Sequence, residues 1–507
     1  MSIVTDIDAH RGPGSNRPFE TLSSVSRSWP ARIILLAGLV VLPGPSARSA
    51  TLSVVAHLHT ETSQGEYTAD ELAGILASRG IDVGIVSDHP RLEIQVGMPL
   101  LERLFWVIYR QRSIASDGAA RYAAAVRTAG TRHPPLVLIP GVEANPYYWI
   151  DYDWRGLSLD VRGLHEHVLA FGLEPAEIAR MPSVENGFHP SAARLASATA
   201  AALLALVLVV LVLRRVMSAG TKLPLARSAP RARSAPRAAA AIVLALAFIG
   251  LNRLALELDR LNQYDGDQGS LPYQLFIDAV NRAGGLTFWA HPDIDESIGR
   301  GPVKVITRPY VQHLAQTDHY TGLEGFESRV AGPGQLWDRI LLDYCAGLRA
   351  RPVWNLAQAD FRSGNPDHLL SVVNFVDAEE RSEAAVVDAI RAGRFYATGY
   401  GLGAKWRLAD FRLANAGGSA RSGDHLQGGE TVTLTASFSR IDSGAAPLRV
   451  SVIRAGETVD ERTLVASGEI VLDEPAPAGR RTYYRLIAGI DARIELATNP
   501  IFVDRRR

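Results

Sequence analysis

Short apolar runs alternate with amphipathic segments over two stretches of the chain, residues 51–190 and 259–403. In the first stretch, the strand-length runs "LSVVAHLHT" and "IDVGIVSDH" flank "TADELAGILASRG", whose apolar residues recur at helical spacing. In the second stretch, "LPYQLFIDAVNRAGG" has helical spacing and "LTFWAHPD" has the composition of a strand. Strands that alternate with helices of about 10–15 residues are typical of a parallel α/β barrel or a doubly wound sheet.

The pattern changes over the last part of the chain, residues 404–507. "ETVTLTASFSR", "APLRVSVIRAG" and "TYYRLIAGI" alternate apolar and polar positions, with Gly, Asp and Ser between them. Because each such strand has one apolar face, this alternation predicts a small all-β sandwich after the α/β part.

Two long apolar segments lie between the α/β stretches, within residues 191–258. Leu195 to Leu213 is a run of 19 residues without a charge, enough to cross a hydrocarbon core of about 30 Å. Ala238 to Leu251 is a weaker second segment, and the loop between the two carries seven basic residues and no acidic residue. The positive-inside rule therefore predicts a transmembrane helical hairpin with a cytoplasmic loop. The alternative is a basic linker beside one buried helix.

The first 50 residues contain a third apolar segment, Ile33 to Leu42, which follows Arg27 and Arg32. This segment fits either a cleaved signal peptide or an uncleaved signal anchor behind a cytoplasmic leader. In both cases the chain from Thr51 onward is expected to be exported. The hairpin would leave and re-enter on the same side, so we expect a protein of the cell membrane whose barrel and sandwich lie outside the cytoplasm, in the periplasm.

Composition adds few constraints to this picture. The 507 residues include 53 basic and 53 acidic side chains, so the net charge gives no reason to expect a nucleic-acid partner. The only cysteine is Cys345, which excludes an intrachain disulfide. Cys345 lies in an amphipathic pattern, where we expect it to pack as a small apolar residue.

Polar residues gather where the predicted strands end. His57 and His59 are two positions apart, so in a regular strand their imidazoles would point to the same face. An imidazole pair at a strand end suits Zn²⁺, Mn²⁺ or Fe²⁺. In a barrel this rim is where active sites are built. Further polar residues lie at or near strand ends, except for His167, which begins its strand: Asp88, His89, Glu143, His167, His291 and Asp360.

As an ordered set, these motifs resemble the polymerase and histidinol phosphatase (PHP) domain family. The matching runs are "HLHT", "TADELAGILASRGIDVGIVSDHP", "IPGVEAN", "HVLAFG", "GGLTFWAHP" and "VWNLAQADF", and they cover residues 52–190 and 262–400. The resemblance implies a distorted (β/α)7 barrel and metal-dependent phosphoester hydrolysis. The run "AAVVDAIRAGRFYAT", followed by a β-sandwich, resembles extracytoplasmic branches of the family.

The resemblance also implies the metal ligands. His57, His59, Glu143 and Asp360 would hold one divalent ion, and Glu143 would bridge to a second ion held by His167 and His291. His165 shares a strand face with His167, but the apolar run "VLAFG" follows His167 as in the family motif, which favours His167.

Two positions depart from the family pattern, and both belong to the third metal of the family. The family often has Asp or His where this chain has Gln64, and has His where this chain has Arg362. Arg cannot ligate a metal because its guanidinium stays protonated. Only His89 of that set remains, so we expect a binuclear site with two divalent ions, Zn, Mn or Fe.

Arg362 and His89 are the candidate catalytic residues. The guanidinium of Arg362 could lie beside the metals and bind phosphate oxygens in place of the missing ion. His89, free of metal, could protonate the leaving oxygen, although the family gives it no such role. The alternative for Arg362 is a salt bridge to Asp367 or a place on the surface.

Two classes of function stay open from the sequence. The first is a membrane-tethered hydrolase that acts on a phosphorylated small molecule or a phosphodiester. The second is a non-catalytic metal-binding or ligand-sensing module that uses the hairpin and the sandwich for assembly. The sequence indicates neither the substrate nor the oligomeric state.

Two further features have competing interpretations. The aromatic run from Asn145 to Trp154 fits a substrate mouth, a membrane interface or plain packing. Histidines outside the motifs are expected in solvent: His189, His313, His319, His368 and His425.

Overall fold

The computed structural model describes most of the chain from residue 50 onward. The described ranges are 50–99, 106–153, 158–184, 261–326, 329–399, 405–475, 481–490 and 493–504, with residues 102 and 155 and a few residues between 207 and 250. The predicted signal segment and most of the predicted transmembrane hairpin therefore lie outside the described residues. Within the part that is described, no helix has both the length and the apolar character needed to cross a bilayer.

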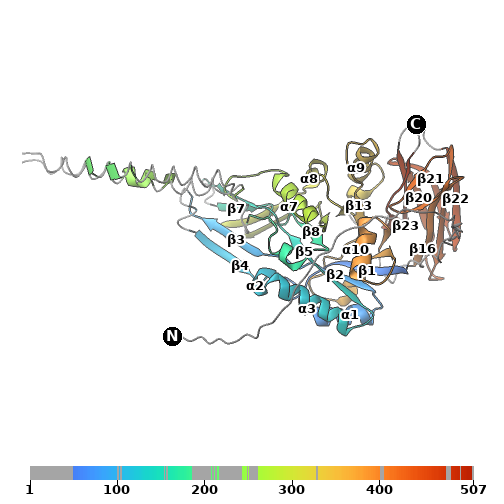
Figure 1. Cartoon of the computed structure of the whole chain (residues 1–507), viewed down its shortest axis with the longest axis horizontal. Coiled ribbons are helices and arrows are strands. Elements are labelled where there is room, and N and C mark those ends of the chain that lie inside the picture. The colour runs from blue at the N-terminus through green and yellow to red at the C-terminus, as the bar shows by residue number, and fades with distance from the viewer. Residues whose placement is uncertain are drawn as a thin grey trace, which may run out of the picture. The chain divides into compact units, whose positions relative to one another are not determined.

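Seven strands form an α/β barrel (Figure 1). Their order is β13-β12-β9-β8-β5-β2-β1. Backbone beyond β13 closes the ring, because Phe361 forms a parallel bridge with Leu58 and its N–H donates to the carbonyl of His57 at 3.0 Å. The strands are β1 (Ala50–Leu58), β2 (Val83–Val86), β5 (Val137–Ala144), β8 (Val168–Phe171), β9 (Leu286–Trp289), β12 (Gly322–Glu324) and β13 (Trp354–Leu356).

Strand β8 runs antiparallel to both of its neighbours, β5 and β9. The parallel arrangement expected from alternating strands and helices does not extend to β8, because the chain passes from β5 to β8 through the strands β6 and β7 rather than through a crossover helix. Reversal places the first residues of β8 at the rim where the parallel strands end. This explains how His167, which precedes β8, can meet residues that follow other strands.

Helices cover the outside of the barrel. Helix α1 begins at a capping box, in which the Thr68 hydroxyl accepts from the Glu71 N–H at 3.2 Å and the Glu71 carboxylate accepts from the Thr68 N–H at 2.9 Å. Its buried face carries Leu72 and Leu76. The helices are α1 (Ala69–Ser78), α2 (Ile114–Asp117), α3 (Ala119–Arg132), α4 (Pro175–Ile178), α7 (Leu271–Arg282), α8 (Val311–Gln316), α9 (Leu336–Cys345) and α10 (Glu383–Arg391), with short 3₁₀ turns at η1 (Arg329–Ala331) and η2 (Pro366–Leu370).

Two small sheets that the sequence pattern did not predict accompany the barrel. One is a ribbon of β3 (Leu92–Gly97) and β4 (Trp106–Gln111). The other has the order β10-β11-β7-β6 and consists of β6 (Trp149–Asp153), β7 (Ser158–Arg162), β10 (Glu296–Arg300) and β11 (Val303–Thr307).

The aromatic run at Asn145–Trp154 enters this second sheet. Tyr147 and Tyr148 are buried. The Tyr147 hydroxyl donates to the carbonyl of Asn262 at 2.8 Å, and the Tyr148 hydroxyl accepts from the N–H of Gln95 at 2.9 Å. Ordered packing, one of the three interpretations left open above, therefore accounts for these two side chains.

The C-terminal strands form two sheets around a shared apolar core that includes Leu434, Val450 and Leu486. The first sheet has the order β17-β16-β19-β22, and the second contains β24-β23-β20-β21 with β25 and β18 at its side. The strands are β16 (Trp406–Asn415), β17 (Gly418–Arg421), β18 (His425–Gln427), β19 (Thr431–Arg440), β20 (Leu448–Arg454), β21 (Glu457–Leu464), β22 (Gly468–Pro475), β23 (Thr482–Ile490), β24 (Arg493–Thr498) and β25 (Ile501–Asp504).

Hydrogen-bonded strands connect the barrel to the sandwich without a break. Strand β14 (Val372–Ala378) pairs with β1, β15 (Phe395–Gly399) pairs with β14, and β24 pairs with β15. The second sheet of the sandwich is thus an extension of the barrel wall (Figure 1).

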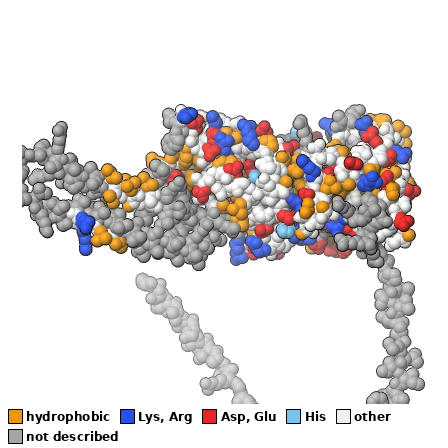
Figure 2. All heavy atoms as spheres, turned by 90° about the horizontal axis from the view of Figure 1, so that it is seen from above, with side chains coloured by type: hydrophobic (Ala, Val, Ile, Leu, Met, Phe, Trp, Pro, Cys, Tyr) orange, Lys and Arg blue, Asp and Glu red, His pale blue; other side chains and the backbone are white. Residues whose placement is uncertain are grey.

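A buried ion pair joins the same two parts. Asp338 of α9 accepts from Arg485 of β23 through both carboxylate oxygens, each at 2.8 Å, and both side chains are fully buried. The Tyr483 hydroxyl donates to the same carboxylate at 2.7 Å, and the Arg485 guanidinium lies over the Trp337 ring. On the face seen in Figure 2, acidic and basic side chains are interspersed.

We predict that breaking this ion pair destabilises the protein strongly. Arg485→Met leaves the Asp338 carboxylate buried without a counter-charge, which costs about 3–5 kcal/mol. The double variant Arg485→Met with Asp338→Leu should recover a large part of that loss, because no buried charge remains. Thermal and urea unfolding of the two variants and the parent measures both effects, and additive losses in the double variant would contradict the explanation.

Candidate metal centre

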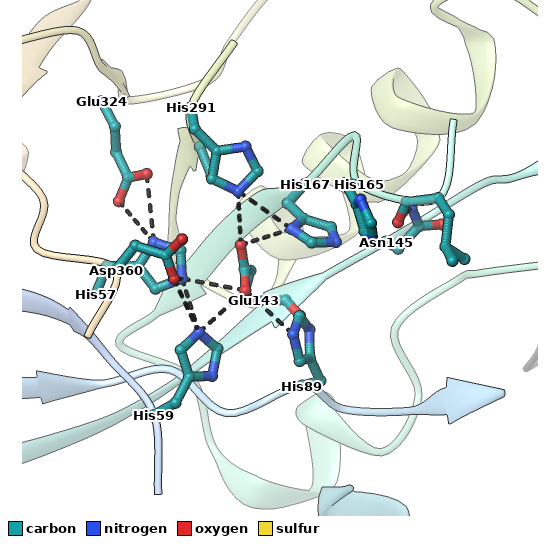
Figure 3. A network of polar contacts seen from close by, with 12 residues as sticks. His57, His59, His89, Glu143, Asn145, His165, His167, His291, Glu324 and Asp360 are labelled. Carbon is teal, nitrogen blue, oxygen red and sulfur yellow. Dashed lines mark hydrogen bonds and ion pairs between the residues drawn. The ribbon is translucent and has the colours of Figure 1, made fainter. Parts of the chain in front are cut away.

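Six candidate ligands converge at the rim where the parallel strands end (Figure 3). They form two groups that share Glu143. The members are His57, His59, Glu143 and Asp360 in the first group, and Glu143, His167 and His291 in the second. These groups coincide with the ligand sets that the sequence resemblance implies.

The first group has the spacing of ligands around one ion. The Nε2 atoms of His57 and His59 lie 3.1 Å apart, and each lies 3.1 Å from Oε2 of Glu143. Oδ1 of Asp360 lies 3.8 Å from Nε2 of His57 and 3.6 Å from Nε2 of His59. A tetrahedral ion with bonds of about 2.0–2.1 Å separates its ligand atoms by roughly 3.3 Å. The four residues therefore fit a divalent metal.

The second group is smaller and more open. Oε1 of Glu143 lies 2.6 Å from Nδ1 of His167 and 3.0 Å from Nε2 of His291, and the two nitrogens are 3.3 Å apart. Three protein ligands leave coordination positions for water or substrate, as in catalytic rather than structural sites. The side chain of His291 is 13% exposed, whereas Glu143 is fully buried, so access is from the His291 side.

Neighbouring groups fix the imidazoles so that ring nitrogens face the centre. Nδ1 of His57 lies 3.2 Å from Oε1 of Glu324, and Nδ1 of His59 lies 3.3 Å from the Ser63 hydroxyl. Neutral imidazole is the form that binds a metal, and with the Nδ1 protons on these contacts both Nε2 atoms would present lone pairs to the centre. Two lone pairs and a carboxylate oxygen in contact repel one another unless a cation lies between them.

The sequence reasoning did not identify Glu324. This buried carboxylate ends β12, and its contact with His57 lies outside either ligand group. The same signal that selected the ligands, a polar residue at the end of an apolar run, was present in "YTGLEGFES".

The electrostatics of the group also favour positive charge. Burial alone would raise the pKa of Glu143, but the charges of His167 and His57 outweigh burial and hold that pKa well below its usual value. Burial alone would lower the pKa of His57, but the carboxylates of Glu143 and Glu324 raise it well above its usual value. The carboxylates thus stabilise a cation where the ring nitrogens meet.

Strained backbone places three of the ligands. His57, His291 and Asp360 have positive φ values of 62°, 25° and 39°. Such conformations cost about 1–3 kcal/mol each for residues other than glycine and concentrate at functional sites. The pairing of β1 with β2 shifts register between Ala56 and Leu58. The expectation that a regular strand presents His57 and His59 together is therefore wrong in its reason, because a bulge at His57 turns the two rings toward one point.

His89 is buried beside the first group. Its Nδ1 lies 2.9 Å from the backbone carbonyl of Glu143, and its Nε2 lies 3.3 Å from Oε2 of Glu143. Burial lowers the pKa of His89 well below its usual value. The neighbouring Asp88 accepts hydrogen bonds from Thr60 and Ser63, so it holds the loop that follows His59.

Arg362 lies at the open side of the centre. Its Nε and Nη2 atoms donate to the two oxygens of Asp360 at 2.9 and 3.2 Å, and Nη2 lies 4.0 Å from Oε2 of Glu143. Its side chain is 37% exposed. The alternative partner, Asp367, instead pairs with Arg79 at 2.5 Å.

His165, His313 and His425 also have carboxylate partners. Nδ1 of His425, which was also expected in solvent, lies 2.6 Å from Oδ2 of Asp504, and its ring stacks on Phe502. Nδ1 of His165 lies 2.6 Å from Oε2 of Glu296, so His165 lies beside the second group without belonging to it. His313, expected in solvent, is buried between aromatic rings and lies 3.3 Å from Oε2 of Glu166. That expectation was wrong because a lone histidine in an amphipathic run gives no sign of which face it occupies.

No protein-family model and no curated protein matches the sequence. Among solved structures, the chain is similar to a two-domain protein from Bacteroides vulgatus that contains a predicted PHP-like metal-dependent phosphoesterase. The identity is 12%, the TM-score is 0.32, and the match covers 86% of this chain and 90% of that one.

Two further solved structures are similar, and each match covers 62% of this chain and 89% of the other. One is a candidate metal-dependent phosphoesterase from Bifidobacterium adolescentis, at 17% identity and a TM-score of 0.26. The other is an amidohydrolase from Chromobacterium violaceum with bound sulfate and no metal, at 16% identity and a TM-score of 0.24. Because these TM-scores are below 0.5, the similarities do not support a function. Any functional proposal must rest on the geometry of the candidate ligands.

We predict that the purified protein holds about two transition-metal ions per chain, one for each ligand group. Glu143→Ala should lose most of both ions, because each carboxylate oxygen faces one group. Elemental analysis of dialysed protein measures the count.

Two variants serve as controls for this prediction. Glu324→Gln should weaken only the first ion, since Glu324 contacts His57 and none of the three ligands of the second group. Glu296→Gln should retain both ions, because Glu296 is an acidic neighbour outside both groups. Three tightly bound ions in the parent, or an unchanged count in Glu143→Ala, would contradict the binuclear assignment.

Proposed function

We propose that the protein is a metal-dependent hydrolase of phosphoesters with a binuclear centre. The observation that carries this proposal is the bridging position of Glu143, with one carboxylate oxygen toward each ligand group. A structural metal site is closed by four ligands, whereas here the second group leaves positions open toward solvent. The nature of the ions, Zn, Mn or Fe, remains part of the proposal.

Bound ions at such a centre generate hydroxide at neutral pH and stabilise the charge of a phosphoryl group. The chain's own part is to hold the ligands and to shape access. Glu324 and Ser63 orient the two imidazoles of the first group. His291 and Asp360 lie at the accessible side, so the phosphoester would approach between them.

Arg362 is the proposed phosphate clamp. Asp360 engages two of its nitrogens and leaves other N–H groups of the fork free to reach a phosphate beside the centre. Its charge would take the place of the third ion that the family uses.

His89 is the proposed donor of a proton to the leaving oxygen. This role requires the proton at Nε2, because Nδ1 faces the carbonyl of Glu143. Burial holds the pKa of His89 well below its usual value, which disfavours the imidazolium form that this role requires.

We further propose that the enzyme is tethered to the cell membrane with its barrel outside the cytoplasm. The support is in the sequence: an uncharged run of 19 residues, a second apolar segment and a basic loop between them. The sequence carries equal numbers of acidic and basic residues, which gives no support to a nucleic-acid partner, and we propose a small phosphorylated molecule or a phosphodiester as substrate.

A panel of phosphomonoesters and phosphodiesters, assayed with the metal-loaded protein, tests the proposal. Turnover that disappears with chelation and returns with metal would support a hydrolase. Full metal occupancy without turnover of any substrate would favour the alternative, a non-catalytic metal-binding or sensing module.

We predict that Arg362→Ala retains both metals but loses turnover. A charge-assisted hydrogen bond contributes on the order of 2–3 kcal/mol, or roughly 30- to 150-fold in kcat/KM. Arg362→Lys should recover only part of this, because an ammonium lacks the planar fork. Steady-state kinetics on a substrate from the panel provides the measurement.

Metal content must be determined in the same preparations, because Arg362 also contacts Asp360. Loss of an ion in Arg362→Ala would mean that the arginine positions Asp360 rather than binding phosphate. Activity within about twofold of the parent would mean that Arg362 does not contribute to turnover, since a phosphate contact of this strength predicts a much larger loss.

The proposed tether predicts opposite locations for two reporter fusions. A fusion at Ala226, in the basic loop, should report the cytoplasm, and a fusion at Gln268, beyond the second apolar segment, should report the exterior. Paired alkaline phosphatase and fluorescent-protein fusions give this readout. The same location at both positions would exclude the transmembrane hairpin.

A further inference from the structure

The β3–β4 ribbon exposes large apolar side chains. Five of them lie within Met98–Tyr109, and Val107 and Tyr109 are 74% and 56% exposed. The sequence from Met98 to Tyr109, "MPLLERLFWVIY", contains only two charged residues. Contiguous exposed apolar surface of this kind marks a site of contact with a partner or a membrane.

Register explains why β4 stays uncovered. Ile94 pairs with Tyr109, and Val96 pairs with Val107, so these four side chains share one face of the ribbon. On that face, Ile94 and Val96 of β3 pack against a cluster formed by Tyr148, Ile150 and Val161, while their partners on β4 project beyond it. The other face of β4 carries Trp106 and Ile108, which are also exposed.

An apolar edge strand in water is unfavourable. In the described part of the chain, β4 pairs only with β3, so its outer edge offers free backbone groups beside exposed aromatic rings. Soluble proteins avoid such edges with charge, proline or a covering element, because bare edges aggregate. Something is therefore expected to cover β4 in its working environment.

The chain on both sides of the predicted transmembrane hairpin, residues 191–258 (below, the insertion), packs beside this same ribbon. Val184, the last described residue before the insertion, and Tyr264, just after it, both pack on the cluster that β3 covers. The Tyr264 hydroxyl donates to the carbonyl of Gln95 in β3 at 3.3 Å, and the carbonyl of Gln263 accepts from Ile150. The chain thus leaves and returns beside the apolar cluster that β3 covers.

Exposed apolar residues concentrate in these two places. Nineteen large hydrophobic side chains are exposed in the described part of the chain; five lie in the ribbon region and six in the short described pieces of the insertion. A lipid bilayer would cover the exposed apolar side chains of both the ribbon and the insertion.

We infer that the β3–β4 ribbon rests in the interfacial layer of a lipid bilayer. Trp106 and Tyr109 have the amphipathic rings that concentrate at this depth of a membrane. The nearby cations are already paired, Arg110 with Glu93 at 2.8 Å and Arg112 with Asp117 at 3.1 Å, so apolar burial rather than attraction to anionic lipids drives the contact.

This contact would orient the metal centre. Strand β3 begins at Leu92, three positions after His89, so the ribbon extends directly from the rim of the site. The inference rests on the proposed tether for the chain's location, but it does not rest on hydrolysis.

A pair of single-cysteine labels tests the inference in the full-length chain. Cys345 is the only cysteine, so Cys345→Ser gives a cysteine-free background. Val107→Cys and the control Leu348→Cys then carry an environment-sensitive fluorophore; both native side chains are 74% exposed, and Leu348 follows helix α9, which contacts the sandwich. The labelled proteins are reconstituted in phosphatidylcholine vesicles and isolated by flotation.

Label at position 107 should be quenched by nitroxide-bearing lipids several-fold more than label at position 348, and iodide in the water should quench them in the reverse order. Equal quenching by iodide at both positions, or failure to float with vesicles, would overturn the inference. Protection of position 107 from both quenchers would also overturn it, because the chain's own insertion or a second copy would then cover the ribbon.

The reporter fusions, the quenching experiment and the substrate panel test the tether, the membrane contact of the ribbon and the hydrolase activity independently. The reporter fusions can place the insertion across the membrane while label 107 stays in water, and that result rejects only the docking of the ribbon. An inactive substrate panel rejects the hydrolase and leaves the labelling result unchanged.

Discussion

Glu143 is a fully buried carboxylate in contact with imidazole rings on both of its oxygens, and the arrangement of the barrel rim depends on it. A buried charge without compensation would cost several kcal/mol. Here the compensation comes from residues of several strands, which must all reach the same point. His57 lies at the end of β1 and His59 just after it, His167 precedes β8, and His291 follows β9. The carboxylate is thus stable only when the barrel is closed around it.

The cost of this arrangement is visible in the backbone. Positive φ values at His57, His291 and Asp360 mean that the fold holds ligands where unconstrained residues would not remain. Regular strands would present their side chains along a line rather than toward one point. Irregular backbone is therefore concentrated at the residues whose side chains must meet at the metal centre. Packing in the rest of the barrel offsets the free-energy cost of this strain.

Much of the barrel and of the ligand set could be predicted from the sequence, because apolar runs of strand length that end in polar residues mark a rim. The limits of that reasoning are also physical. Strand direction is not encoded in apolar spacing, so the reversal of β8 was missed. Glu324 contacts His57 from a strand distant in sequence, and no local pattern reports such a contact. Arg362 could be placed beside the centre, but not its bidentate contact with Asp360, which depends on side-chain conformation.

The pairing of β15 with β24 makes the sandwich part of the barrel wall rather than an appended module. Asn499, which follows β24, strengthens this union: its side chain accepts from the N–H of Asn355 in β13 at 2.8 Å and donates to the carbonyl of Phe395 in β15 at 3.1 Å. Residues near the C-terminal end of the chain therefore complete hydrogen bonding in strands that surround the metal ligands. A chain still under synthesis would carry an open β15 edge until β24 emerged, so the barrel wall is completed only once the sandwich strands are present.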